Sequence, residues 1–175
     1  QGSQGILLAQ DTETLESALV RDPSLIICEY LPGKEYTIDC YSNAEGTVLF
    51  SGGRERIRTR AGISVRSKTV PQGGPLAARI AEIGERISAR LAMTGMWFFQ
   101  VKEAADGTLK LLEVAPRIAG TMALHRVQGI NFPLLALFEA QGFSVDSIVE
   151  RFDAEIDRAL INRYTLALDY SCIYL

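Results

Sequence analysis

The sequence predicts an α+β fold, with a mostly antiparallel sheet flanked by helices. Two pairs of strand-like segments are each joined by a tight turn, which is typical of hairpins rather than of parallel βαβ units. Between them, the segment that begins at Pro75 repeats its apolar residues with the 3.6-residue period of a helix. Hairpins mixed with single helices argue against a doubly wound fold.

The amino-terminal part is expected to contain two short strands around one helix. Residues 6–9 and 25–30 are apolar enough for strands. Asp11 is a suitable N-cap for a helix that runs through Val20, with acidic residues in its first turn. A hairpin follows, with strands at 35–41 and 47–50 and a turn at 43–46.

The next helix and hairpin have the clearest patterns. After Pro75, the apolar helix positions are Leu76, Ile80, Ile83, Ile87 and Leu91. Residues 95–104 and 108–114 form the second predicted hairpin, because Asp106-Gly107 tolerates the positive φ that its turn requires.

The carboxyl-terminal third is expected to be mainly helical. Helices are predicted at 121–128 and 132–141, with a shorter one capped by Ser144. Residues 158–168 have mixed strand-like character, and 170–175 form an apolar strand-like end. We therefore expect one unit over residues 1–150 and an extension over 151–175 that leads toward a possible further domain.

Composition excludes several classes of protein. The 175 residues are 47% hydrophobic and 22% charged, with a net charge of -3, which gives no general attraction to nucleic acid or membranes. No apolar run reaches the roughly 18 to 20 residues of a membrane span. Cys28, Cys40 and Cys172 lack the paired spacing of a zinc site. We interpret them as reduced core thiols of a cytoplasmic protein.

The second hairpin carries the strongest candidate site. It places Gln100 on one strand, Glu113 at the end of the other, and Arg117 just beyond. An amide oxygen and a carboxylate suit Mg²⁺ or Mn²⁺, and Mg²⁺ takes only one or two protein carboxylates plus substrate phosphates. The alternative is an ordinary core hairpin that ends in a charged residue.

A basic segment is the second candidate. In a regular strand one face would carry Arg54, Arg56, Arg58 and Arg60. Such a row suits phosphate or a carboxylate substrate, and Arg60 and Arg66 flank a glycine-containing link. The alternative is a solvated face paired with acidic residues. The remaining conspicuous side chains are interpreted as structural, with a cleft-lining role as the alternative for the first of them: His125, Trp97, Phe98 and Phe99. Lys102 shares a strand face with Gln100 and could contact phosphate; the alternative is a surface lysine.

Four segments together resemble the ATP-grasp superfamily, and more closely its carbamoyl-phosphate-synthase-like carboxylate–amine ligases. The segments are EYLPGKEYTID, RIRTRAGISVRSKTV, WFFQVKEAADGTLKLLEVAPR and GINFPLLAL, in the order of the family and covering residues 29 to about 137. The resemblance implies an ATP-grasp-like sheet that is truncated on its amino-terminal side. It also implies ATP and Mg²⁺ as ligands, small carboxylate and amine substrates, and a preceding lobe.

The resemblance assigns roles to individual residues. Backbone groups of Glu29, Tyr30 and Leu31 would bind adenine, and Glu35 would bind the ribose hydroxyls. Gln100 and Glu113 match the metal-binding pair, and Arg117 matches the arginine that steadies an acyl phosphate. The first residues resemble half of the glycine-rich loop over the phosphates, or else a tail: Gly2, Ser3, Gln4 and Gly5.

One residue departs from the family pattern. Where Glu-x-Asn-Pro-Arg is usual, this chain has Ala115 in place of the asparagine. Three functions therefore stay open: an ATP-dependent ligase module, a catalytically degenerate nucleotide-binding domain, and a nucleic-acid-binding module that uses residues 54–68.

Overall fold

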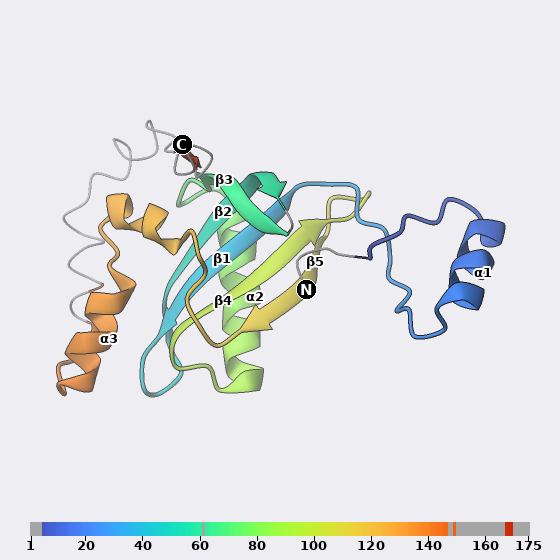
Figure 1. The fold of residues 1–175 in the computed structure, drawn as a ribbon. Coiled ribbons are helices and arrows are strands. Elements are labelled where there is room, and N and C mark those ends of the chain that lie inside the picture. Colours follow the sequence, from blue (N-terminus) through green and yellow to red (C-terminus); the bar gives the residue numbers. More distant parts are fainter. Residues whose placement is uncertain (1–4, 61, 147–148, 150–166, 170–175) are drawn as a thin grey trace, which may run out of the picture.

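In the computed structural model, the described residues are 5–60, 62–146, 149 and 167–169. They form an α+β structure around one antiparallel sheet in the order β5-β4-β1-β2-β3-β6 (Figure 1). The strands are β1 (Glu35–Ser42), β2 (Val48–Arg60), β3 (Ile63–Thr69), β4 (Gly95–Glu103), β5 (Leu109–Ala115) and β6 (Ala167–Asp169). The helices are α1 (Thr12–Arg21), α2 (Pro75–Leu91), the 3₁₀ helix η1 (Met122–Gln128) and α3 (Phe132–Ala140).

One face of the sheet is covered by α2 (Figure 1). Its apolar residues Ile80 and Ile87 pack against alternate residues of β1 and β4, and together they form the main core. These strand residues are Tyr36, Ile38, Cys40, Trp97, Phe99 and Val101. The predicted helix that starts at Pro75 is therefore confirmed.

Among the described residues, η1 and α3 cover one end of the opposite face. Tyr41 points into this second cluster and donates a hydrogen bond from its hydroxyl to Glu139, 2.7 Å away. The other buried members of the cluster are Ile130, Phe132, Leu135, Val145 and Val149. The rest of this face, toward the start of β1, is not covered by a described helix.

The amino-terminal predictions are confirmed in part. Asp11 caps α1 by accepting a hydrogen bond from the Thr14 amide, as expected. The predicted strands at 6–9 and 25–30 are wrong: no described strand pairs with them, and Ile26 is 87% exposed. A strand needs a neighbour to satisfy its backbone groups, so an apolar sequence alone does not form one.

The remaining element predictions are confirmed in outline. Both hairpins form, although β2 extends much further than the predicted 47–50. Residues 121–128 wind as a 3₁₀ rather than an α-helix. β6 overlaps the segment predicted as strand-like at 158–168 only at residues 167 and 168 and extends to Asp169. The remainder of that segment, most of the helix after Ser144 and the end at 170–175 lie outside the described residues.

Two further expectations concern the cysteines and membrane-spanning segments. Cys40 is buried in the core as predicted, but Cys28 is exposed, because the segment around it pairs with none of the described strands. Cys172 lies outside the described residues. Within the described part of the chain, none of the helices is long and apolar enough to cross a membrane.

Candidate functional site

The face of the sheet opposite α2 carries three transverse rows of side chains. The middle row contains Arg54, Thr37, Gln100 and Glu113, which are partners across β2, β1, β4 and β5. The row toward the start of β1 contains Glu35, Lys102 and Lys110. The third row contains Gly52, Asp39, Phe98 and Ala115. Neighbouring rows are about 6.6 Å apart, because two strand residues separate them.

Gln100 and Glu113 are direct cross-strand partners, as the sequence pattern predicts. Gln100 is half-buried and Glu113 is exposed at the sheet edge. A break in register follows Gln100, since its neighbour Val101 pairs with Leu111 and leaves Leu112 as an extra residue. Such a bulge re-aims a strand's side chains, and it lets Lys110 and Glu113 face the same side although they are three residues apart.

Glu35 lies in a cluster of positive charges. Its carboxylate is 2.9 Å from Arg56 Nε and 3.9 Å from Lys102 Nζ. The Arg56 contact is an ion pair without a well-aligned hydrogen bond. Burial lowers the pKa of Arg56, while the charges of Glu35 and Glu113 oppose this change only in part. The charges of Glu35 and Glu113, which belong to two different rows, therefore both influence the pKa of Arg56.

The predicted adenine-binding segment lies at the end of the same face. Gly33 donates from its amide to the Glu103 carbonyl, 3.0 Å away, which ties the segment to the end of β4. Glu29 is exposed and lies 3.8 Å from Lys110 Nζ, and Tyr30 is also exposed, whereas Leu31 is buried. Three features therefore follow one another along this face: the segment from Glu29 to Leu31, the row of Glu35 and the row of Gln100.

Arg117 lies next to the third row, beyond β5. Its guanidinium carbon is 4.8 Å from the centre of the Phe98 ring, and its side chain is exposed. The cation–π contact holds the guanidinium near Ala115 and one row from Gln100 and Glu113. Phe98 itself is buried, as are Trp97 and Phe99 on neighbouring positions, so the prediction that these aromatic residues are structural is confirmed.

A buried charge network joins the third row to the middle row and to η1. Asp39 accepts hydrogen bonds from Arg54 Nε at 2.6 Å and Nη2 at 3.1 Å, and its Oδ2 lies 3.0 Å from His125 Nε2. Burial alone would raise the pKa of Asp39, but the Arg54 charge and the contacts with His125 outweigh it and hold that pKa below its ordinary value. The structural interpretation of His125 is confirmed, because its side chain is fully buried.

The row of four arginines does not form one regular face. Arg54 is fully buried against Asp39, and register shifts between Arg56 and Thr59 interrupt the alternation before Arg60. Arg60 and Arg66 are exposed near the tip of the β2–β3 hairpin, away from the Gln100 row along the sheet. Gly5 is an exposed turn residue with φ of 74°; Gly2, Ser3 and Gln4 lie outside the described residues.

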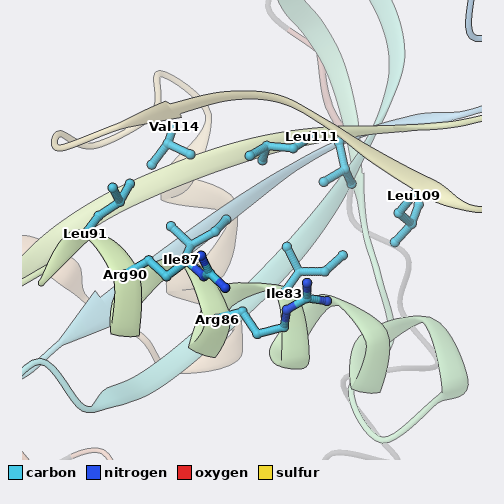
Figure 2. A pocket seen from close by; sticks show the side chains of 9 residues that line it. Ile83, Arg86, Ile87, Arg90, Leu91, Leu109, Leu111 and Val114 are labelled. Atoms are coloured by element: carbon cyan, nitrogen blue, oxygen red, sulfur yellow. The ribbon is translucent and has the colours of Figure 1, made fainter.

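An apolar groove of about 370 Å³ lies on the opposite face, between α2 and β5 (Figure 2). Its lining residues are Ile83, Arg86, Ile87, Arg90, Leu91, Val101, Leu109, Leu111 and Val114. Val101, Leu111 and Val114 alternate with the residues of the three rows, so they point away from Gln100 and Glu113. The groove is therefore separate from the candidate site.

The residues of the candidate site fit a metal that is held mainly by its substrate. Among the described residues, no group of three or more His, Cys, Asp or Glu side chains is placed to hold a metal ion. Gln100 and Glu113 supply two oxygen-bearing groups in register on an open face. This is the small protein share that Mg²⁺ needs when phosphates provide other ligands.

The sequence did not reveal the buried network of Asp39, Arg54 and His125, nor that Lys110 lies opposite Lys102. An aspartate directly between the apolar residues Ile38 and Cys40 is the available signal for a buried charge, because such a group needs a partner. The partner, His125, is 86 residues away, so the sequence does not show which residue it is.

A comparison with protein families identifies the family to which the chain belongs. Residues 21–161 match the model described as "ATP-grasp in the biosynthetic pathway with Ter operon". The chain belongs to this ATP-grasp family. The match includes α2, both hairpins and all three rows of the candidate site. No curated protein matches the sequence.

Solved structures share the fold of this ATP-grasp chain at low identity. An L-amino acid ligase from Bacillus licheniformis is 24% identical over 73% of the chain, with a TM-score of 0.54. A biotin carboxylase from Campylobacter jejuni, in complex with β-γ-ATP, is 14% identical over 75%, with a TM-score of 0.58. An N5-carboxyaminoimidazole synthetase from Staphylococcus aureus, with ADP, is 19% identical over 70%, with a TM-score of 0.53.

The ATP-grasp chain is much shorter than these proteins. It covers 34%, 32% and 33% of their lengths, respectively. The matched part is therefore about one third of each of these proteins.

Proposed function

We propose that this chain is a module of an ATP-dependent carboxylate–amine ligase, similar to those of the carbamoyl-phosphate synthase type. The observation that carries the proposal is the cross-strand pair of Gln100 and Glu113 on the sheet face opposite α2, with Arg117 one row away. Membership of the ATP-grasp family and the ligase among the similar structures support it.

In the proposed reaction, ATP phosphorylates a carboxylate and an amine then displaces the phosphate. Glu29, Tyr30 and Leu31 would hold the adenine through their backbone, and Glu35 would accept hydrogen bonds from the ribose hydroxyls. Gln100 and Glu113 would hold Mg²⁺ or Mn²⁺, which when bound neutralises phosphate charge. Arg117, kept in place by Phe98, would stabilise the negative charge that develops on the acyl group.

The other predicted contacts complete the proposal. Arg60 and Arg66 are exposed on the β2–β3 hairpin and would attract the carboxylate substrate. Gly2, Ser3, Gln4 and Gly5 would approach the phosphates through backbone amides. The work of the protein in such a reaction is mostly positioning and charge neutralisation.

A second candidate function is nucleotide binding without turnover. Ala115 favours it, because its methyl group stands on the site face, two residues beyond Glu113, where the family pattern has an asparagine. The nucleic-acid alternative has less support: Arg54 is fully buried against Asp39 and cannot reach a phosphate backbone.

Calorimetric titration tests the proposal. ADP is titrated into the chain with and without Mg²⁺, beside Glu113→Gln and the matched control Glu45→Gln in the exposed β1–β2 turn. We expect Mg²⁺-dependent binding that is lost in Glu113→Gln and retained in Glu45→Gln. Binding that ignores Mg²⁺, or equal affinity in both variants, contradicts the assigned pair.

A turnover assay separates the two candidate functions. ADP formation from ATP is measured with pools of amino acids and other small carboxylates. Acceptor-dependent ADP formation that falls in Arg117→Ala supports the ligase. Nucleotide binding without acceptor-dependent ADP formation supports a nucleotide-binding domain that does not turn over ATP.

A further inference from the structure

Lys102 and Lys110 lie directly opposite each other on β4 and β5. Both occupy the face that carries Gln100 and Glu113, one row nearer the segment from Glu29 to Leu31. Two like charges in direct cross-strand positions destabilise a sheet. The placement therefore has an energetic cost that the hairpin itself does not require.

Each lysine has a carboxylate nearby but is not tightly held by it. Lys102 Nζ is 3.9 Å from Glu35, and Lys110 Nζ is 3.8 Å from Glu29. Both distances exceed the 2.7–2.9 Å of a charge-assisted hydrogen bond. Glu35 is held more closely by Arg56, at 2.9 Å. Because an ammonium group has three donors, both lysines retain capacity for a further anion.

The bulge at Leu112 is what brings the second lysine to this face. Without the extra residue, Lys110 and Glu113 would point to opposite sides, because their spacing of three is odd. With it, an ammonium group and a carboxylate of β5 face the same side, beside Lys102 and Gln100. The arrangement places two ammonium groups, each at the end of a flexible side chain, next to the proposed metal-binding pair.

We propose that Lys102 and Lys110 bind the phosphate chain of the nucleotide, between its ribose and the metal-binding pair. The inference rests on the proposed function and assigns a phosphate subsite to this lobe of the fold. The two ammonium groups offset part of the charge of ADP. They also exchange their long contacts with Glu35 and Glu29 for closer ones with phosphate oxygens.

The test compares ligands that differ only in phosphate number. Adenosine, AMP and ADP are titrated, with Mg²⁺, into the wild-type chain, Lys102→Met and Lys110→Met, which keep the stem and remove the charge. Lys68→Met is the matched control, since Lys68 is an exposed β3 lysine opposite Glu55, outside the three rows. Lys102→Arg keeps a cation at the first position.

We expect each methionine variant to weaken ADP binding about tenfold, the effect of losing one hydrogen bond to a charged group. Adenosine affinity stays unchanged, the salt dependence of ADP binding falls, and Lys102→Arg retains most of the affinity. Unchanged ADP binding, an equal loss for adenosine, or the same loss in Lys68→Met overturns the inference. A wild-type chain that binds none of the three ligands instead contradicts the proposed function.

Discussion

The imidazole of His125 contacts the carboxylate of Asp39 at 3.0 Å, and neither side chain is exposed by more than a few per cent. The contact joins η1 to the middle of β1. Arg117 lies in the connection between β5 and η1, so this connection is fixed by the sheet at one end and by His125 at the other. We therefore expect the buried network to help hold Arg117 beside the Phe98 ring.

The first prediction concerns acid stability. The pKa of Asp39 is lowered in the folded state, so its charged form stabilises the fold at neutral pH. This stabilisation is complete above the ordinary aspartate pKa of about 3.9 and is lost as the pH falls through the lower folded-state value. Asp39→Asn should lower the free energy of unfolding at pH 7 by about 3–5 kcal/mol, because Arg54 stays buried without a counter-ion.

Urea denaturation between pH 3 and about 7 measures this effect. The wild type should lose stability toward acid more steeply than Asp39→Asn. Glu45→Gln, at an exposed turn position, is the control and should follow the wild-type curve. Parallel curves for Asp39→Asn and the wild type would contradict a role for the Asp39 charge.

The second prediction uses two glycines in different surroundings. A Cβ at Gly52 would lie 2.4 Å from His125 Cε1 and 2.7 Å from the Phe50 ring, so both side chains would have to move. Gly52→Ala should destabilise the protein by about 1–3 kcal/mol. At Gly84, within α2, the nearest atoms are 3.6–3.9 Å away, so Gly84→Ala should stabilise it by about 0.5–1 kcal/mol. Thermal unfolding should show a lower melting temperature for Gly52→Ala and a higher one for Gly84→Ala. Melting temperatures that both change in the same direction would refute the packing argument.

The third prediction concerns Ala115. Its side chain lies on the site face, and an asparagine there would add an amide oxygen beside Glu113. Ala115→Asn should lower the Mg²⁺ concentration needed for ADP binding by up to about tenfold, since metal affinity follows the number of oxygen ligands. Ala115→Val fills similar space without an oxygen and serves as the control. Equal Mg²⁺ dependence in both variants would show that position 115 does not reach the metal.

Local patterns are what made part of this structure predictable. The hairpin of β4 and β5 follows from the Asp106-Gly107 turn, and the pairing of Gln100 with Glu113 follows from that hairpin. Helix α2 follows from Pro75 and its apolar period. Each of these depends on residues close in sequence, whose geometry is fixed by turn and helix chemistry.

Features that depend on distant residues were not predictable in the same way. The segments at 6–9 and 25–30 are apolar but have no pairing strand among the described residues. The bulge at Leu112 reverses the face expected for Lys110, and simple alternation from Glu113 gives the wrong side. The contact of Asp39 with His125 joins residues that only the folded sheet brings together.

The last prediction concerns Glu35 and Arg56, whose ion pair joins β1 to β2 at 2.9 Å. Arg56 is largely buried and also donates to the Gly62 carbonyl, so it links this pair to the end of the β2–β3 hairpin. Arg56→Met should therefore free the Glu35 carboxylate to change its position, which should weaken binding at the predicted ribose site.

A double-mutant cycle of Glu35→Gln and Arg56→Met separates coupling from independent effects. We expect the two changes in unfolding free energy to be non-additive by about 1 kcal/mol or more, because the side chains are in direct contact. The same cycle on adenosine binding should also be non-additive, with Arg56→Met having little effect once Glu35 is replaced. Additivity within about 0.3–0.5 kcal/mol in both measurements would mean that Arg56 does not position Glu35.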